Sequence, residues 1–255
     1  MEVEVILHPA EIAILPQARP DLRGAACVVF DVLRATTSIV TAFADGGARA
    51  VYPAATLEEA RALKASAALA GALLGGERGG LPLPGFDLGN SPREYADAAR
   101  LGGRDIVATT TNGTVALRAC VLAGAAVVHV AALRNLGALA AHLRDTPPAR
   151  LCIVCAGTVN AFSLEDAFGA GALLAELEKL GVPLLAFSDA VPAVAAVYAH
   201  FRGDALLAFR AAANGRRLEE IGLGEDLPWC AQTSVCSVLP ALSGEGLTAG
   251  AIRPL

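Results

Sequence analysis

Short apolar runs alternate along this chain with longer segments of helical periodicity. Such runs, for example 27–30, are typical of strands covered on both faces of a sheet, and their alternation with helices indicates an α/β protein. The predicted strands are Glu4–Leu7, Cys27–Phe30, Ala50–Pro53, Leu73–Gly75, Asp105–Ala108, Val127–Ala131, Leu151–Cys155 and Leu184–Phe187. The predicted helices are Ser38–Ala44, Leu57–Ala70, Pro92–Leu101, Thr114–Leu122, Leu136–Leu143, Leu164–Leu180, Val191–His200 and Asp204–Ala213.

An internal repeat relates residues 28–57 to residues 105–134 at one offset, so that Thr37 matches Thr114 and Gly47 matches Gly124. Each copy consists of a strand, a threonine-rich turn, a helix and a strand, which is a βαβ unit used twice. We therefore expect a three-layer α/β/α fold with a largely parallel sheet built from repeated βαβ units. Residues 1–255 would form one domain with two pseudo-repeat halves.

The first threonine-rich turn begins with Asp31, at the end of a buried strand, where open α/β sheets present functional side chains. Arg34, Thr36 and Thr37 follow at the start of a helix, whose free N–H groups favour anions. A catalytic or metal-binding role for Asp31 is one interpretation. A plain ion pair between Asp31 and Arg34 is the other.

The second turn, TTTNGT, occupies the equivalent place in the other copy. The Asn–Gly pair is expected to supply positive φ, and Thr114 to cap the next helix. The threonines could instead prolong the strand, because β-branched residues favour that conformation. If the two turns converge, their hydroxyls would bind an anion; the candidates here are Thr109, Thr110, Thr111, Asn112, Gly113 and Thr114.

A glycine- and proline-rich segment, 75–95, lies between the two copies and contains many polar side chains. Loops of this length inside a compact domain are usually functional or disordered. Ser91 is expected to cap a helix that begins at Pro92. The candidate site residues of this segment are Glu77, Arg78, Asp87, Asn90 and Ser91.

A further acidic pair, Glu165 and Asp166, follows the strand that ends at Cys155. Ser163 and Asp166 have the spacing of a helix cap with an acid in the first turn. The pair could therefore serve only the helix, or it could point into the same pocket as Asp31.

Composition excludes several classes of protein. A net charge of −5 without a basic cluster gives nucleic-acid binding no support, and the absence of a long apolar run argues against a membrane span. The N-terminus lacks the features of a signal peptide. Cys152 and Cys155 would lie on opposite faces of a strand, which disfavours redox chemistry, and no second CxxC or nearby histidine completes four zinc ligands. We expect a reducing, cytoplasmic setting; the sequence leaves a homo-oligomer open.

These residue types together favour phosphoryl chemistry on a small acidic molecule. Carboxylate and hydroxyl oxygens suit Mg²⁺, which binds through one or two carboxylates plus a substrate phosphate. Arginines suit phosphate, carboxylate and sulfonate. The predicted catalytic residues are Asp31, Glu77, Glu165 and Asp166, and the predicted metal ligands are Asp31, Glu77, Asp87 and Asp166.

The motifs VVFDVLRATTSIVTA, GGERGG, GFDLGNSPREY, TTTNGT, SLEDAFGAG and GEDLPWCAQTSVCSVLP, in this order, resemble the 2-phosphosulfolactate phosphatase (ComB) family. The resemblance implies an α/β/α, Mg²⁺-dependent phosphatase that converts 2-phospho-3-sulfolactate to 3-sulfolactate in coenzyme M biosynthesis. Its motif positions are Asp31, Arg34, Thr36, Thr37, Glu77, Arg78, Asp87, Asn90, Ser91, Thr109–Thr111, Asn112, Thr114, Cys155, Gly157, Glu165 and Asp166.

One position departs from this family's pattern, which tends to place an acid a few residues after the cysteine that corresponds to Cys230. Ser234 stands in that region here.

Two alternatives stay open. A haloacid-dehalogenase-like phosphatase would use Asp31 as nucleophile, but its motif needs a second aspartate where Leu33 stands. A non-catalytic anion- or metabolite-binding protein would keep the pocket and release no phosphate.

Overall fold

The computed structural model describes residues 1–18, 22–159, 161–244 and 250–255. Its strands are β1 (Glu2–Ile6), β2 (Ala26–Phe30), β3 (Ala50–Pro53), β4 (Leu73–Arg78), β5 (Leu81–Pro82), β6 (Asp105–Thr109), β7 (Val127–Ala131), β8 (Arg150–Cys155), β9 (Leu185–Ala186), β10 (Pro240–Ser243) and β11 (Arg253–Pro254). Its helices are α1 (Pro9–Ala18), α2 (Ala35–Ala44), α3 (Leu57–Ala65), α4 (Ala98–Leu101), α5 (Gly113–Leu122), α6 (Leu136–Asp145), α7 (Leu164–Lys179), α8 (Ala190–His200), α9 (Ala205–Ala211), α10 (Ala213–Glu220) and α11 (Asp226–Cys230), with 3₁₀ turns η1 (Ala67–Leu69), η2 (Glu94–Ala96) and η3 (Leu133–Asn135).

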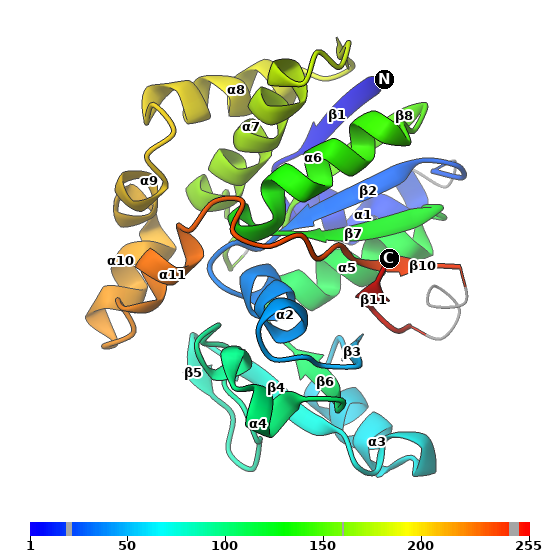
Figure 1. The fold of residues 1–255 in the computed structure, drawn as a ribbon, viewed down its shortest axis with the longest axis vertical. Coiled ribbons are helices and arrows are strands. Elements are labelled where there is room, and N and C mark those ends of the chain that lie inside the picture. Colours follow the sequence, from blue (N-terminus) through cyan, green and yellow to red (C-terminus); the bar gives the residue numbers. More distant parts are fainter. Residues whose placement is uncertain (19–21, 160, 245–249) are drawn as a thin grey trace.

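The strands form two sheets (Figure 1). The larger has the order β11-β10-β7-β2-β8-β1-β9, and the smaller has the order β3-β6-β4-β5. Pairing is parallel except at the β10 and β5 edges, where β10 is antiparallel to β7 and β11 and β5 is antiparallel to β4. The predicted α/β class with mostly parallel strands is confirmed.

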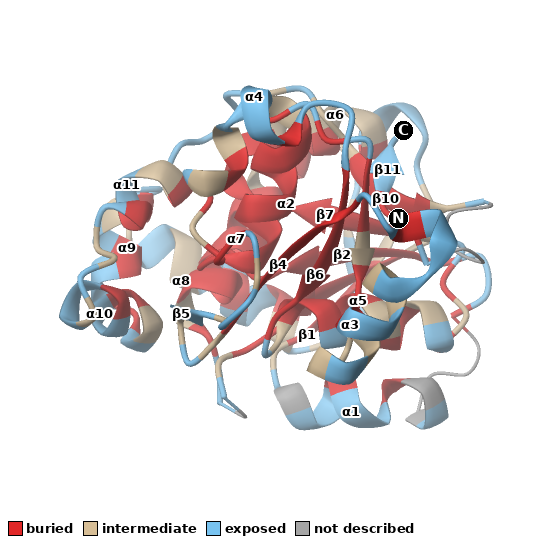
Figure 2. Ribbon diagram, turned by 90° about the horizontal axis from the view of Figure 1, so that it is seen from below, coloured by how far each residue is buried: buried red, intermediate tan, exposed pale blue. Residues whose placement is uncertain are grey.

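Alternating side chains of the large sheet enter two separate cores. In β2, Cys27 and Val29 pack with residues of α2 and α5, whereas Val28 and Phe30 pack with residues of α6 and α7. Helices thus cover both faces of this sheet, consistent with a three-layer α/β/α fold. Figure 2 shows that α2 and the central strands β2 and β6 are buried, whereas the edge strand β5 is exposed.

The two repeat copies exchange strands between the sheets. The first copy is β2–α2–β3 and the second is β6–α5–β7. β2 pairs with β7 in the large sheet, while β3 pairs with β6 in the small one. Each copy therefore begins in one sheet and ends in the other, and the two helices lie between the sheets (Figure 1).

All eight predicted strands are present, with ends that differ by up to three residues. The continuous helix predicted over Pro92–Leu101 is wrong, because Asp97 has extended backbone there and its carboxylate caps the short helix α4. The helices predicted at Leu57–Ala70 and Asp204–Ala213 are likewise interrupted, at Ser66 and Ala212. The sequence reading missed α1, α10, α11, β5, β10 and β11.

The cysteine prediction is confirmed in its geometry. Cys152 and Cys155 lie on β8 and face the two different cores. All six cysteines are free thiols. Within the described ranges, no helix has both the length and the apolar character needed to cross a membrane.

Candidate active site

Asp31 is the first residue of the turn that joins β2 to α2. Its Oδ1 accepts a hydrogen bond from the N–H of Ala35, the first residue of α2 (3.2 Å), and its own N–H donates to Thr36 Oγ1 (3.1 Å). Thr37 Oγ1 donates to the carbonyl of Val32 (2.8 Å). The hydroxyls of Thr36 and Thr37 are buried and build this turn, so their predicted contact with an anion stays a prediction.

Asp31 faces the start of α5. A Cβ added to Gly113 would lie 2.8 Å from Asp31 Oδ2 and 2.8 Å from the Cβ of Ala35, so only glycine fits between the two helix starts. Burial raises the pKa of Asp31 to about 7, against the lowering effect of the Ala35 N–H. The Glu77 and Glu165 carboxylates contribute to this rise. Burial and neighbouring carboxylates thus act together on Asp31 to disfavour its charged form.

The second turn differs from its prediction in two respects. Asn112 has φ of −122°, and neither it nor Gly113 is among the residues with positive φ, so the glycine serves close approach instead. The N-cap residue of α5 is Asn112, whose side chain makes no capping bond, and the N–H of Thr114 donates to the hydroxyl of Thr110 (3.2 Å). Thr114 returns a bond to the carbonyl of Thr110 (3.1 Å), so it does not cap the helix as predicted.

Glu77, near the end of β4, joins this second turn to the β4–β5 hairpin. Its Oε1 accepts from the N–H (2.9 Å) and the hydroxyl (3.0 Å) of Thr111, and its Oε2 accepts from the N–H of Gly80 (2.8 Å). Arg78, the next residue, donates to the carbonyl of Glu77 (2.6 Å) and to Thr109 Oγ1 (3.1 Å). Its hydrogen bonds are thus to neutral acceptors.

Arg34 forms an ion pair with Asp226. The alternative expectation, a plain ion pair between Asp31 and Arg34, is therefore wrong. Arg34 Nη1 lies 2.7 Å from Asp226 Oδ2, and Arg34 Nη2 donates to the carbonyl of Gly80 (2.7 Å). The Ser91 hydroxyl donates to the other oxygen of Asp226 (2.6 Å). Ser91 is therefore no helix cap, in contrast to the prediction.

Glu165 and Asp166 lie at the start of α7, and Asp166 contacts the turn that follows Asp31. The predicted cap is confirmed, since Ser163 Oγ accepts from the N–H of Asp166 (3.2 Å). Asp166 also accepts from the N–H groups of Val32 (2.9 Å) and Gly157 (3.1 Å). Burial raises the pKa of both acids, and Glu165 raises that of Asp166 further.

Asp87 and Asn90 join the 83–95 segment to β4 and to α2, respectively. Asp87 Oδ2 accepts from the N–H of Leu74 (2.8 Å), and the carbonyl of Asn90 accepts from the hydroxyl of Ser38 (2.9 Å). Asp87 therefore ties the loop to the strand.

These elements enclose a pocket of about 460 Å³ at the end of β2. The predicted site residues that line it are Asp31, Arg34, Glu77, Arg78, Asn90, Thr111 and Asn112. Those that do not line it are Thr36, Thr37, Asp87, Ser91, Thr109, Thr110, Gly113, Thr114, Glu165 and Asp166. Asn214 and Arg217 of α10 also line the pocket. These two residues were not predicted from the sequence.

A family model described as 2-phosphosulpholactate phosphatase matches residues 13–245. The chain belongs to the 2-phosphosulpholactate phosphatase family. A relative from Gloeobacter violaceus is 38% identical over 247 residues, which cover 97% of this chain and 98% of the relative. Others are 38% identical in Deinococcus radiodurans, covering 95% of this chain and 97% of the relative, and 41% identical in a Synechococcus species, covering 87% and 90%. All three are named probable 2-phosphosulfolactate phosphatase.

The departure from the family pattern at Ser234 lies outside this pocket. Ser234 Oγ accepts from the N–H of Gly137 (3.0 Å) at the start of α6, and the residue is exposed. The acid that contacts the site from this C-terminal segment is Asp226, eight residues earlier. The GEDLPWC motif contained it, but nothing local in the sequence indicated that it pairs with Arg34.

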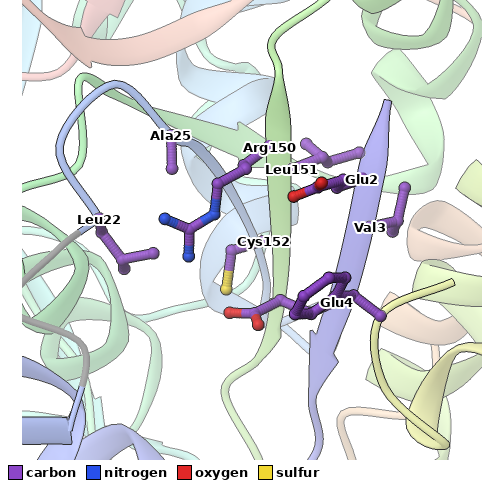
Figure 3. Close-up of a pocket in the computed structure, with 9 residues that line it drawn as sticks. Glu2, Val3, Glu4, Leu22, Ala25, Arg150, Leu151 and Cys152 are labelled. Carbon is purple, nitrogen blue, oxygen red and sulfur yellow. The ribbon is translucent and has the colours of Figure 1, made fainter. Parts of the chain in front are cut away.

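A second hollow, at the opposite end of the large sheet, is too small for a substrate. It has a volume of about 10 Å³, room for roughly one water molecule. Glu2, Glu4, Arg150 and Cys152 of β1 and β8 line it (Figure 3). The pocket beside Asp31 is therefore the candidate active site.

Proposed function

We propose that this protein is a Mg²⁺-dependent phosphatase that hydrolyses 2-phosphosulfolactate, or a closely related phosphorylated hydroxy acid, to the hydroxy acid and phosphate. Membership of the family supports the phosphatase class. The observation that carries the proposal is that Asp31, Glu77 and Arg78 line the same pocket, which brings two carboxylates and a guanidinium to one cavity.

The donor set fits Mg²⁺. Within the described residues, no three His, Cys, Asp or Glu side chains form a ready metal cage. Mg²⁺ does not require one, because it keeps several waters and binds through one or two carboxylates plus substrate phosphate. Asp31 and Glu77 are the two described carboxylates that line the pocket. The pKa of Asp31 is raised mainly by burial and further by the neighbouring carboxylates, and a bound cation would favour its ionised form. These two would hold the ion.

Bound Mg²⁺ would supply neutralisation of the phosphoryl charge. The chain itself orients the reactants. The guanidinium of Arg78, whose hydrogen bonds go to neutral acceptors, is available to stabilise charge that develops on the phosphoryl oxygens. Asp31, fixed by the N–H of Ala35 and wedged against Gly113, can orient a water molecule for attack.

The test is a screen of phosphate release over phosphorylated hydroxy acids, with Mg²⁺ and with excess chelator. We expect 2-phosphosulfolactate to be the best substrate and chelator to abolish turnover. Tight binding without phosphate release would identify a non-catalytic binding protein instead. A phospho-aspartate trapped at Asp31 would support the haloacid-dehalogenase-like alternative.

A further inference from the structure

Three arginines, Arg34, Arg78 and Arg217, line the described part of the pocket, and they differ in how their charge is balanced. Arg34 is 3% exposed and its guanidinium is committed to Asp226 and the carbonyl of Gly80. Its charge is therefore largely balanced within the protein before any substrate arrives.

Arg78 and Arg217 come from different walls. Arg78 ends β4, donates to Thr109 Oγ1 at the end of β6, and lines the pocket together with Asp31. Arg217 comes from α10, whose pocket-facing residues 213, 214, 217 and 218 have the spacing of one helix face.

Helix α10 contacts the turn after Asp31 and the β4–β5 turn. The Asn214 side chain donates to the carbonyl of Leu33, in the turn after Asp31 (2.5 Å). At the other end, a Cβ added to Gly80 would lie 3.0 Å from Cδ1 of Ile221, so the β4–β5 turn contacts the end of α10. Arg217 is thus carried on a helix that is held in place.

The Arg217 guanidinium has only a weak partner. Its side chain is 56% exposed, and among the described residues its one ion pair is with Glu220, which is 3.8 Å away and 67% exposed. Ion pairs between exposed side chains of this kind contribute little. Arg217 is therefore a cation at the pocket wall that is available to an anionic ligand.

We infer that Arg217 determines substrate specificity by binding the sulfonate of the substrate, while Arg78 binds the phosphate. This inference rests on the proposed function. In 2-phosphosulfolactate the phosphate and the carboxylate share one carbon, and the sulfonate is on the next carbon. The phosphate at the Asp31–Glu77 end would therefore direct the sulfonate towards another wall. A guanidinium suits the oxygens of such a group.

The experiment compares Arg217→Met with Arg216→Met, a matched control on the same helix whose guanidinium bonds the carbonyl of Ala211 and does not line the pocket. We expect Arg217→Met to lower kcat/KM for 2-phosphosulfolactate about 100-fold, mainly through KM. For 2-phospholactate, which lacks the sulfonate, the change should stay within about twofold. The control, Arg216→Met, should leave kcat/KM for both substrates unchanged. Equal losses on both substrates, or no loss on either, would overturn the inference while the phosphatase assignment stands.

Calorimetric binding of 3-sulfolactate supplies a readout that does not depend on turnover. Arg217→Met should weaken binding at least 30-fold, and Arg216→Met should not. If the wild-type protein releases no phosphate but binds 3-sulfolactate in this Arg217-dependent way, the proposed function fails and the inference holds. Unchanged binding in Arg217→Met would contradict the inference.

Discussion

Arg34 and Asp226 form a buried ion pair in which Nη1 lies 2.7 Å from Oδ2 and both side chains are 3% exposed. They are 192 residues apart in the chain. The pair joins the turn after β2 to α11, and Ser91 bonds the same carboxylate from the 83–95 segment. It therefore ties three separate parts of the chain together beside the pocket.

Removal of one partner should be strongly destabilising, because it leaves the other charge buried and unpaired. We expect Asp226→Asn to lower the free energy of unfolding by about 3–5 kcal/mol, measured by urea denaturation. The matched control is Glu225→Gln in the neighbouring pair with Arg93, whose side chains are 80% and 50% exposed. That change should cost less than about 1 kcal/mol. Similar losses from both variants would show that Arg34 and Asp226 are not held as described.

Gly113→Ala should disturb the site rather than the helix. Alanine normally favours a helix over glycine by about 1 kcal/mol, but here the new Cβ would meet Asp31 and Ala35. We expect phosphatase activity to fall at least tenfold. Gly71→Ala, at a position with no atom within 4 Å of the added Cβ, is the control and should keep full activity. Normal activity in Gly113→Ala would argue against close approach at this point.

Glu77→Gln should loosen the pocket wall. Both carboxylate oxygens accept from N–H or O–H donors, and a glutamine amide nitrogen cannot replace one of these acceptors. We expect kcat/KM to fall at least 100-fold and the Mg²⁺ concentration for half-maximal activity to rise. Glu178→Gln, an exposed change on α7, should have no effect. An unchanged Mg²⁺ requirement in Glu77→Gln would remove Glu77 from the proposed metal ligands.

Stability should depend on pH through His129. Burial lowers the pKa of this β7 side chain from 6.5 to about 4, and its Nδ1 has no hydrogen-bond partner within the described structure. The folded state then binds fewer protons than the unfolded state, so the contribution of neutral His129 is complete above pH 6.5. It is lost as pH falls towards 4, by up to about 3 kcal/mol.

The measurement is urea unfolding at a series of pH values between 4 and 7. His129→Leu should lose less stability than wild type as pH falls from 6.5 to 4, whereas His200→Gln, at an exposed residue, should keep the wild-type slope. Identical slopes in wild type and His129→Leu would show that His129 does not control this dependence.

The sequence allowed prediction of those features that local pattern determines. A run such as 27–30 is apolar throughout because both faces of β2 are buried, and this makes the strand recognisable. Asp31 could be placed at the pocket because it follows that run. The division of the repeat copies between two sheets could not be predicted, since β2–β7 and β3–β6 pairing depends on contacts between distant segments.

The threonines of both turns show a second reason why part of the site could not be predicted from the sequence. Their number suggested an anion site, yet Thr36, Thr37, Thr110 and Thr114 hydrogen-bond to the backbone of their own turns. A hydroxyl that binds its own backbone and one that faces a ligand have the same sequence pattern. Arg217 was missed for the related reason that α10 carries no motif that points to the pocket.

The central claim is that Asp31, at the pocket wall, is required for Mg²⁺-dependent phosphate release. The most direct measurement is inorganic phosphate released from 2-phosphosulfolactate at saturating Mg²⁺ by wild type and by Asp31→Asn, with unfolding measured in parallel. We expect the variant to stay folded and to lose at least about 1,000-fold in kcat. Turnover within tenfold of wild type by folded Asp31→Asn would contradict this account.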